Sequence, residues 1–164
     1  MVKSFLLVDD EEGIRKVLSI ALSDLGYRVH TAANGVEALR VFEAKKPPIV
    51  LTDIKMPEMD GIELLRRIKK ICPDTEIIMI TGHGDMDLAI KSVKYEATDF
   101  VTKPINDEVL EIALNRAVER IAMRQKLKEY TQNLEHLVRE KSQQLVEAER
   151  LAAVGQTVAG LSHA

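Results

Sequence analysis

The segment Ile49-Val50-Leu51-Thr52-Asp53 decides the fold, because it is a short apolar run that ends directly in an acidic residue. Such a run is typical of a strand buried on both faces of a parallel sheet. Residues 4–8 repeat the pattern and run into Asp9 and Asp10. Further strands are expected at residues 27–31, 76–81 and 99–102, with apolar residues at helical spacing between them. Five strands alternating with helices predict an α/β fold with a doubly wound parallel sheet and helices on both faces.

The composition excludes several classes of protein. The chain has 164 residues, of which 46% are apolar and 30% charged, as in ordinary globular domains. A net charge of -3 offers no broad basic surface, so we expect no nucleic-acid partner. Cys72 is the only cysteine, which excludes a disulfide framework and a cysteine zinc site. The N-terminal segment reaches Asp9 too soon for a signal peptide, and no apolar run has the length of a membrane span. We therefore expect a cytoplasmic protein without membrane contact.

Five polar residues gather at one edge of the expected sheet. Asp9, Asp10, Asp53, Thr81 and Lys103 each lie at or just beyond the carboxyl end of a strand, the edge where open parallel sheets bind ligands. Clustered carboxylates raise one another's pKa unless a cation joins them, and a hard divalent ion such as Mg2+ suits oxygen ligands. A lone aspartate at a strand end is more often a helix cap, and Asp10 is a candidate for that role. Five such residues at one edge favour a functional site.

Four segments resemble the receiver domain of two-component response regulators, the CheY-like family: residues 7–11, 51–61, 80–84 and 98–104. Their order and spacing cover roughly residues 3 to 120, and we take residues 1–120 as this domain. The resemblance implies a flavodoxin-like fold with five parallel strands.

The resemblance also implies a chemistry. Asp53 is the expected phosphoacceptor, taking a phosphoryl group from the histidine of a partner kinase or phosphotransfer protein. Asp10, Asp53 and the Lys55 backbone carbonyl are the expected Mg2+ ligands, and Asp9 acts largely through water. Phosphoryl transfer needs the charge on the transferring oxygens to be neutralised, which such residues provide.

The remaining implied roles concern switching and shape. Thr81 and Lys103 are expected to contact phosphoryl oxygens, and Phe100 stands where the family has its switch aromatic. The Lys103–Pro104 bond resembles the cis bond of the family. Glu96 departs from the pattern, because the family usually has glycine there, which affects the local turn and the choice of partner.

The C-terminal third has a different character. No proline follows Pro104 and no glycine lies between Gly84 and Gly155, so a helix starting after Asn106 meets no stop signal. Two series of residues spaced by seven form a heptad pattern, widened by Val138 and Leu145: Leu127, Leu134, Lys141, Ala148 and Gly155; Tyr130, Leu137, Gln144, Leu151 and Val158. We expect residues 121–150 to be a linker helix that pairs as a parallel homodimeric coiled coil. At about 1.5 Å per residue, the last sixty residues would extend about 90 Å as a helix. The alternative is a solvated single helix.

Residues 151–164 resemble the start of a histidine-kinase dimerisation helix, with His163 as a second phosphoacceptor. Ala164 replaces the usual acidic neighbour, and we expect a fragment cut just after His163. The leading hypothesis is a phosphorelay protein whose receiver signals through the helix to a kinase region. The alternative is a response regulator whose coiled coil recruits a separate protein. A DNA-binding regulator is a weaker third class, since the chain lacks a basic recognition helix.

Overall fold

The computed structural model describes residues 4–162, and side chains as far as residue 154. Within that range, five strands alternate with five helices. In chain order these elements are β1 (Ser4–Val8), α1 (Glu12–Asp24), β2 (Arg28–Ala32), α2 (Gly35–Lys45), β3 (Ile49–Asp53), α3 (Gly61–Ile71), β4 (Glu76–Thr81), α4 (Met86–Lys94), β5 (Asp99–Thr102) and α5 (Asp107–Ser162).

The strands form one parallel sheet in the order β2-β1-β3-β4-β5. This order reverses direction between β1 and β3, which is the feature that opens a ligand crevice at the carboxyl ends of the strands. The five-stranded, doubly wound, flavodoxin-like fold expected from the sequence is therefore confirmed.

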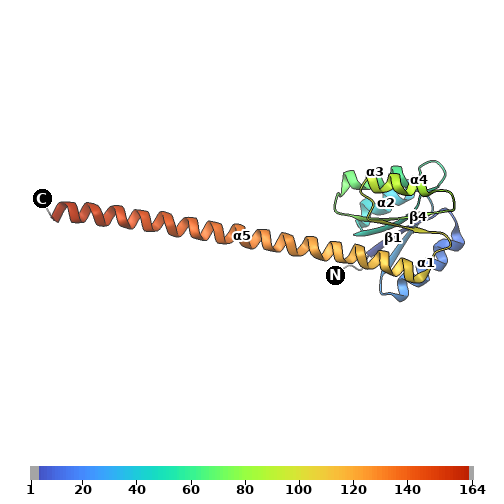
Figure 1. Ribbon diagram of the computed structural model, residues 1–164, viewed down its shortest axis with the longest axis horizontal. Helices are drawn as coiled ribbons and strands as arrows, with labels where there is room; N and C mark the ends of the chain where they lie inside the picture. The colour runs from blue at the N-terminus through green and yellow to red at the C-terminus, as the bar shows by residue number, and fades with distance from the viewer. Residues whose placement is uncertain (1–3, 163–164) are drawn as a thin grey trace. The chain divides into compact units, whose positions relative to one another are not determined.

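Alternate residues of the buried strands supply two separate cores, one on each face of the sheet (Figure 1). On one face, Phe42 of α2 and Leu65 of α3 pack against Leu6 and Val50. On the other face, Leu22 of α1 and the first turns of α5 pack against the opposite set of strand residues. Because both faces are covered, β1, β3 and β4 are apolar along most of their length rather than alternating.

The boundaries of two elements differ from those expected. β2 is formed by Arg28–Ala32 rather than by residues 27–31. The N-cap of α1 is Glu11 and not Asp10, so Asp10 does not have the capping role considered from the sequence. Asn106 does cap the start of α5, where its Oδ1 accepts a hydrogen bond from the Glu108 backbone amide at 2.8 Å.

The turn before β5 explains why glycine is usual at position 96. Glu96 has φ of 70°, in the left-handed region where a Cβ atom is crowded. The departure from the family pattern therefore places a residue with a side chain in a backbone conformation that favours glycine.

Helix α5 belongs to two compact units, which divide between Ile121 and Ala122. Within the first unit, two ion pairs hold the helix to the amino ends of strands: Arg116 to Asp99 at 2.9 Å and Arg120 to Glu76 at 3.0 Å. The second unit is helical from Ala122 to Ser162 and exposes its large apolar side chains. None of the helices in residues 4–162 is both long enough and apolar enough to cross a membrane.

Candidate functional site

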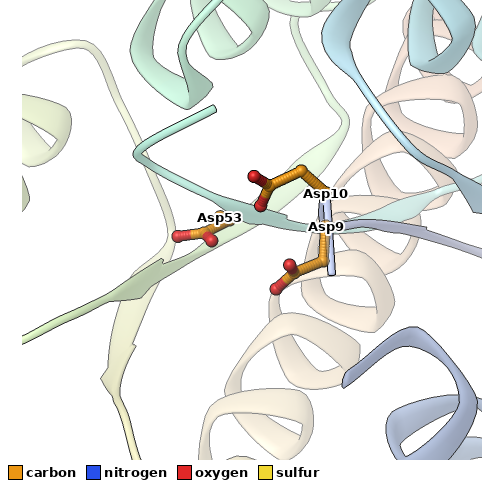
Figure 2. A group of neighbouring side chains, drawn as sticks. All are labelled: Asp9, Asp10 and Asp53. Carbon is orange, nitrogen blue, oxygen red and sulfur yellow. The ribbon is translucent and has the colours of Figure 1, made fainter. Parts of the chain in front are cut away.

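Three carboxylates meet at the carboxyl edge of the sheet. Asp9 and Asp10 follow β1, and Asp53 is the last residue of the neighbouring strand β3. Figure 2 shows these three side chains around the ends of the two strands. One oxygen from each lies within 4.8 Å of the others. Asp9 and Asp53 are buried while Asp10 is exposed, so the cluster is open to solvent on the Asp10 side.

Lys103 partly neutralises this cluster. Its Nζ lies 2.9 Å from Asp53 Oδ2 and 3.6 Å from Asp9 Oδ2. Only the first distance is a hydrogen bond, which leaves Asp9 Oδ2 buried without a hydrogen-bond partner. The other oxygen, Asp9 Oδ1, accepts the backbone N–H of Glu11 at 2.9 Å. A buried carboxylate oxygen without a partner is costly, and a cation at the cluster would relieve that cost.

The electrostatics follow from this geometry. Burial raises the pKa of Asp9 from 3.8 to about 6, and the charge of Asp53 contributes in the same direction. Burial also raises the pKa of Asp53, although the hydrogen bond from Lys103 works against it. For Lys103, partial burial lowers the pKa, but the hydrogen bond to Asp53 and the nearby carboxylates outweigh it and raise the pKa overall. Two carboxylates with raised pKa values beside one ammonium are a concentration of negative charge that favours a bound cation.

Thr81 and Phe100 lie on the adjoining strands. Thr81 is the last residue of β4, one position beyond Ile80, which is the register partner of Asp53. Thr81 is buried, and its carbonyl accepts the Lys103 backbone amide at 2.7 Å. Phe100 of β5 is half-buried and packs against the core that contains α2, α3 and α4. The Lys103–Pro104 bond is cis, as the resemblance implies.

The loop after β3 returns closely to Asp53. The Gly61 amide donates to the Ile54 carbonyl at 2.7 Å, and a Cβ atom at Gly61 would lie 2.2 Å from the Asp53 carbonyl oxygen. Only glycine permits this approach. The loop that carries Lys55 is therefore held against the end of β3 by a backbone contact.

An ion pair links this loop to the loop after β4. Lys55 Nζ lies 2.8 Å from Asp85 Oδ1, and Asp85 Oδ2 accepts the Gly82 amide at 3.3 Å. The ammonium of Lys55 lowers the pKa of Asp85. The two loops beside the carboxylates are thus joined by side chains.

Three residues of this region were not identified from the sequence: Gly61, Asp85 and Arg15, whose Nη1 donates to the Asp9 carbonyl at 2.7 Å. Signals existed for two of them. Asp85 precedes a helix and follows a glycine-rich loop, and Gly61 is the last residue of the segment 51–61 that carries the family resemblance. His163 lies outside the described residues.

The donor set fits a hard divalent ion. All three groups offer carboxylate oxygens, the ligands that Mg2+ prefers, and one of those oxygens lacks a hydrogen-bond partner. These acidic groups lie at the carboxyl edge of a doubly wound sheet, which is where open α/β sheets bind ligands, and Lys103 is hydrogen-bonded to one of them.

The chain belongs to the response regulator receiver domain family, whose model matches residues 5–115. It is 38% identical over 117 residues to the transcriptional regulatory protein GlrR of Escherichia coli (strain K12), covering 71% of this chain and 26% of that protein. It is 35% identical over 134 residues to the nitrogen assimilation regulatory protein NtrX of Azorhizobium caulinodans, covering 80% of this chain and 30% of that one. The chain thus spans between a quarter and a third of the length of these relatives.

Among solved structures, a response regulator receiver domain protein from Clostridium thermocellum shares 38% identity with a TM-score of 0.72, covering 74% of this chain and 98% of that one. NtrX from Brucella abortus shares 33% identity with a TM-score of 0.75, covering 79% of this chain and 29% of that chain. Receiver domains take phosphoryl groups from histidine kinases and generally bind Mg2+ through acidic residues.

Proposed function

We propose that this receiver accepts a phosphoryl group on Asp53 in a Mg2+-dependent reaction. The observation that carries the proposal is the position of Asp53, with Lys103 Nζ at 2.9 Å and the Asp9 and Asp10 carboxylates within 4.8 Å. A carboxylate oxygen of Asp53 forms the new P–O bond while the P–N bond to the donor's histidine breaks. The bonding electrons leave with the imidazole.

The surrounding residues have distinct roles in this proposal. Asp9, Asp10, Asp53 and the Lys55 carbonyl would hold Mg2+, with Asp9 acting largely through water. The ion, when bound, neutralises charge on the transferring oxygens. Lys103, already beside Asp53, is placed to pair with a phosphoryl oxygen as the negative charge of the site grows.

Thr81 and Phe100 would transmit the effect of phosphorylation from Asp53 to the surface of the domain. The Thr81 hydroxyl would donate a hydrogen bond to another phosphoryl oxygen, and Phe100 on the neighbouring strand would move with it. The acyl phosphate carries roughly -1.5 to -2 charge where the ionised carboxylate carried -1, and it adds phosphoryl oxygens that accept hydrogen bonds; together these changes would bias a two-state arrangement of the adjoining loops.

The test is labelling by a small phosphodonor with and without Mg2+. We expect wild-type protein to be labelled only with Mg2+ and Asp53→Asn not to be labelled. The matched control is Asp60→Asn, because Asp60 is a nearby carboxylate whose cap of α3, through the Glu63 amide, asparagine preserves. Persistent labelling of Asp53→Asn at the rate of the control would refute the assignment of the acceptor.

The second part of the proposal is that α5 forms a homodimer through residues beyond Ile121. Leu127, Tyr130 and Leu134 are 60–67% exposed and lie three and four residues apart. One apolar stripe along a solvated helix is unfavourable by itself, and pairing with a second copy covers it. Light scattering and solution scattering should give the mass of a dimer; Leu134→Asp should give a monomer, while Glu129→Gln on another face should not. A wild-type monomer would contradict the dimer.

The third part concerns the output. In the leading hypothesis, residues 151–164 begin a histidine-kinase dimerisation helix, and the receiver changes the packing of α5 and the exposure of His163. With an ATP-binding kinase domain fused after residue 164, His163→Gln should then remove phosphate transfer from ATP. Unchanged transfer would favour the alternative, a response regulator whose helix recruits a separate protein. Relatives named as regulatory proteins support the role of a response regulator and give no support to the kinase direction.

A further inference from the structure

We propose that the apolar seam of the paired helix changes phase after Leu134. The seam then continues through Val138 and Leu145 rather than through Leu137 and Gln144. A second copy of this chain, aligned in parallel and in register, packs along the shifted seam. This inference rests on the proposed dimer and specifies its interface.

The spacing of the apolar residues carries the argument. From Met123 to Leu134 the stripe follows alternate steps of four and three residues, through Leu127 and Tyr130. A continued heptad would next place Leu137, Lys141 and Gln144 in the seam, which gives two successive polar layers.

A step of four from Leu134 leads instead to Val138, Lys141 and Leu145, and leaves a single polar layer. On the single helix, the side chains of Val138 and Leu145 are 63% and 65% exposed. Leu137, which the continued heptad would place in the seam instead, is 51% exposed. The shifted seam therefore covers two exposed apolar side chains, where the continued heptad covers only one, Leu137.

An eleven-residue period supports the same path. Met123, Leu134 and Leu145 are eleven residues apart, and so are Leu127 and Val138. Eleven residues in three turns correspond to about 3.67 residues per turn, close to the 3.6 of a straight helix. An extra four-residue step of this kind locally unwinds the left-handed supercoil. The paired helices should thus run nearly parallel and straight around residues 134–145.

The seam is large enough for a second copy to be its occupant. Burying a leucine-sized side chain removes on the order of 100 Å2 from water. The apolar seam positions between Met123 and Leu145, taken from two chains, would bury about 1,000 Å2, near the lower end of stable protein interfaces. The single polar layer at Lys141 would restrict the register of the two helices, as a single polar layer does in coiled coils. The aliphatic stem of the lysine would cover apolar surface while its ammonium group reaches water.

Disulfide formation between identical positions tests the phase directly. Cys72 is the only cysteine, so a Cys72→Ser background lets single substitutions be introduced at Leu134, Leu137, Val138, Gln144 and Leu145. Mild oxidation should link Val138→Cys and Leu145→Cys several-fold faster than Leu137→Cys and Gln144→Cys. Leu134→Cys, which both seams share, is the positive control.

Each other outcome has a defined meaning. Equal or faster linkage at 137 and 144 overturns the phase change but leaves the dimer in place. Linkage at only one of the five positions indicates antiparallel helices and overturns the parallel seam. No linkage at any position, Leu134→Cys included, refutes the proposed dimer itself.

A measurement without cross-linking gives a second test. Leu145→Ala should weaken dimerisation at least tenfold, measured by sedimentation equilibrium, because it removes a seam contact from both chains. Gln144→Ala should change the dissociation constant less than threefold. The opposite order of effects would overturn the shifted seam.

Discussion

Replacing Asp9 by asparagine should stabilise the metal-free protein and, at the same time, weaken its response to Mg2+. Asp9 is completely buried, and its Oδ2 has no hydrogen-bond partner. Asparagine has the same shape, keeps the oxygen that accepts the Glu11 amide, and removes the charge. The substitution therefore isolates the cost of keeping this carboxylate ionised at the sheet edge.

The size of the effect follows from the raised pKa. The carboxyl is protonated in the folded and the unfolded chain below pH 3.8, so its ionisation costs no stability there. Between pH 3.8 and about 6 the folded state holds the proton more tightly, and the cost grows as pH rises. At about 1.4 kcal/mol per pH unit, the full cost above pH 6 is about 3 kcal/mol. The amide NH2 group of asparagine would itself be buried, and burying it costs part of this gain. The net increase in the free energy of unfolding of Asp9→Asn over wild type is therefore about 1–2 kcal/mol.

The assay is urea unfolding in EDTA at pH 4 and at pH 7.5. Asp9→Asn should exceed wild type in free energy of unfolding at pH 7.5 and should lose that advantage at pH 4. MgCl2 should stabilise wild type at pH 7.5 and stabilise Asp9→Asn much less. Asp10→Asn is the control: Asp10 is exposed, so its loss should weaken the Mg2+ response with little change in EDTA. Equal destabilisation by Asp9→Asn at both pH values would refute the reasoning.

Three further substitutions test the fold around the site by the free energy of unfolding. Glu96→Gly should stabilise the protein by about 1 kcal/mol, since it removes a side chain from a residue with φ of 70°; no gain would contradict the strain. Gly61→Ala should destabilise by more than about 2 kcal/mol, because its Cβ would lie 2.2 Å from the Asp53 carbonyl oxygen, whereas Gly13→Ala, with open space around it, should not; equal effects would contradict the close approach. Arg120→Met should cost about 1–3 kcal/mol, because it removes the guanidinium from the buried carboxylate of Glu76 while Arg120 itself is largely exposed. Arg116→Met, at the more exposed Asp99, should cost less than about 1 kcal/mol, and the reverse order would be inconsistent with the burial of Glu76.

The placement of the site could be predicted from the sequence because it depends on topology. Asp9 and Asp53 each come at the end of a buried apolar run, Lys103 directly follows the short strand β5, and parallel strands bring their carboxyl ends to one edge. The convergence of Lys103 on Asp53 across fifty residues therefore required only the sheet order. The same reasoning gave the helices on both faces.

The contacts between loops could not be predicted in this way. The pairing of Lys55 with Asp85 depends on the paths of two loops, and no periodicity specifies those paths. The contacts of Glu76 could not be predicted for the same reason. Glu76 begins an apolar strand and is fully buried, and Arg120, which donates a hydrogen bond to it, lies 44 residues further along the chain. The close approach of Gly61 to Asp53 likewise becomes visible only when both backbones are placed.

For the C-terminal helix, the secondary structure could be predicted from the sequence, but its pairing could not be confirmed. The absence of proline after Pro104 and of glycine between Gly84 and Gly155 predicted an uninterrupted helix, and α5 extends from Asp107 to Ser162. The pairing of this helix with a second copy stays a prediction, which the cross-linking and sedimentation experiments test.

The most direct test of the central claim is to locate the phosphoryl group. The protein is incubated with a small phosphodonor and Mg2+, its intact mass is measured, and the modified residue is identified by tandem mass spectrometry after trapping of the acyl phosphate. We expect one added phosphoryl group, on Asp53, and none in EDTA. A phosphoryl group on any other residue, or an unmodified wild-type protein in the presence of Mg2+, would contradict it.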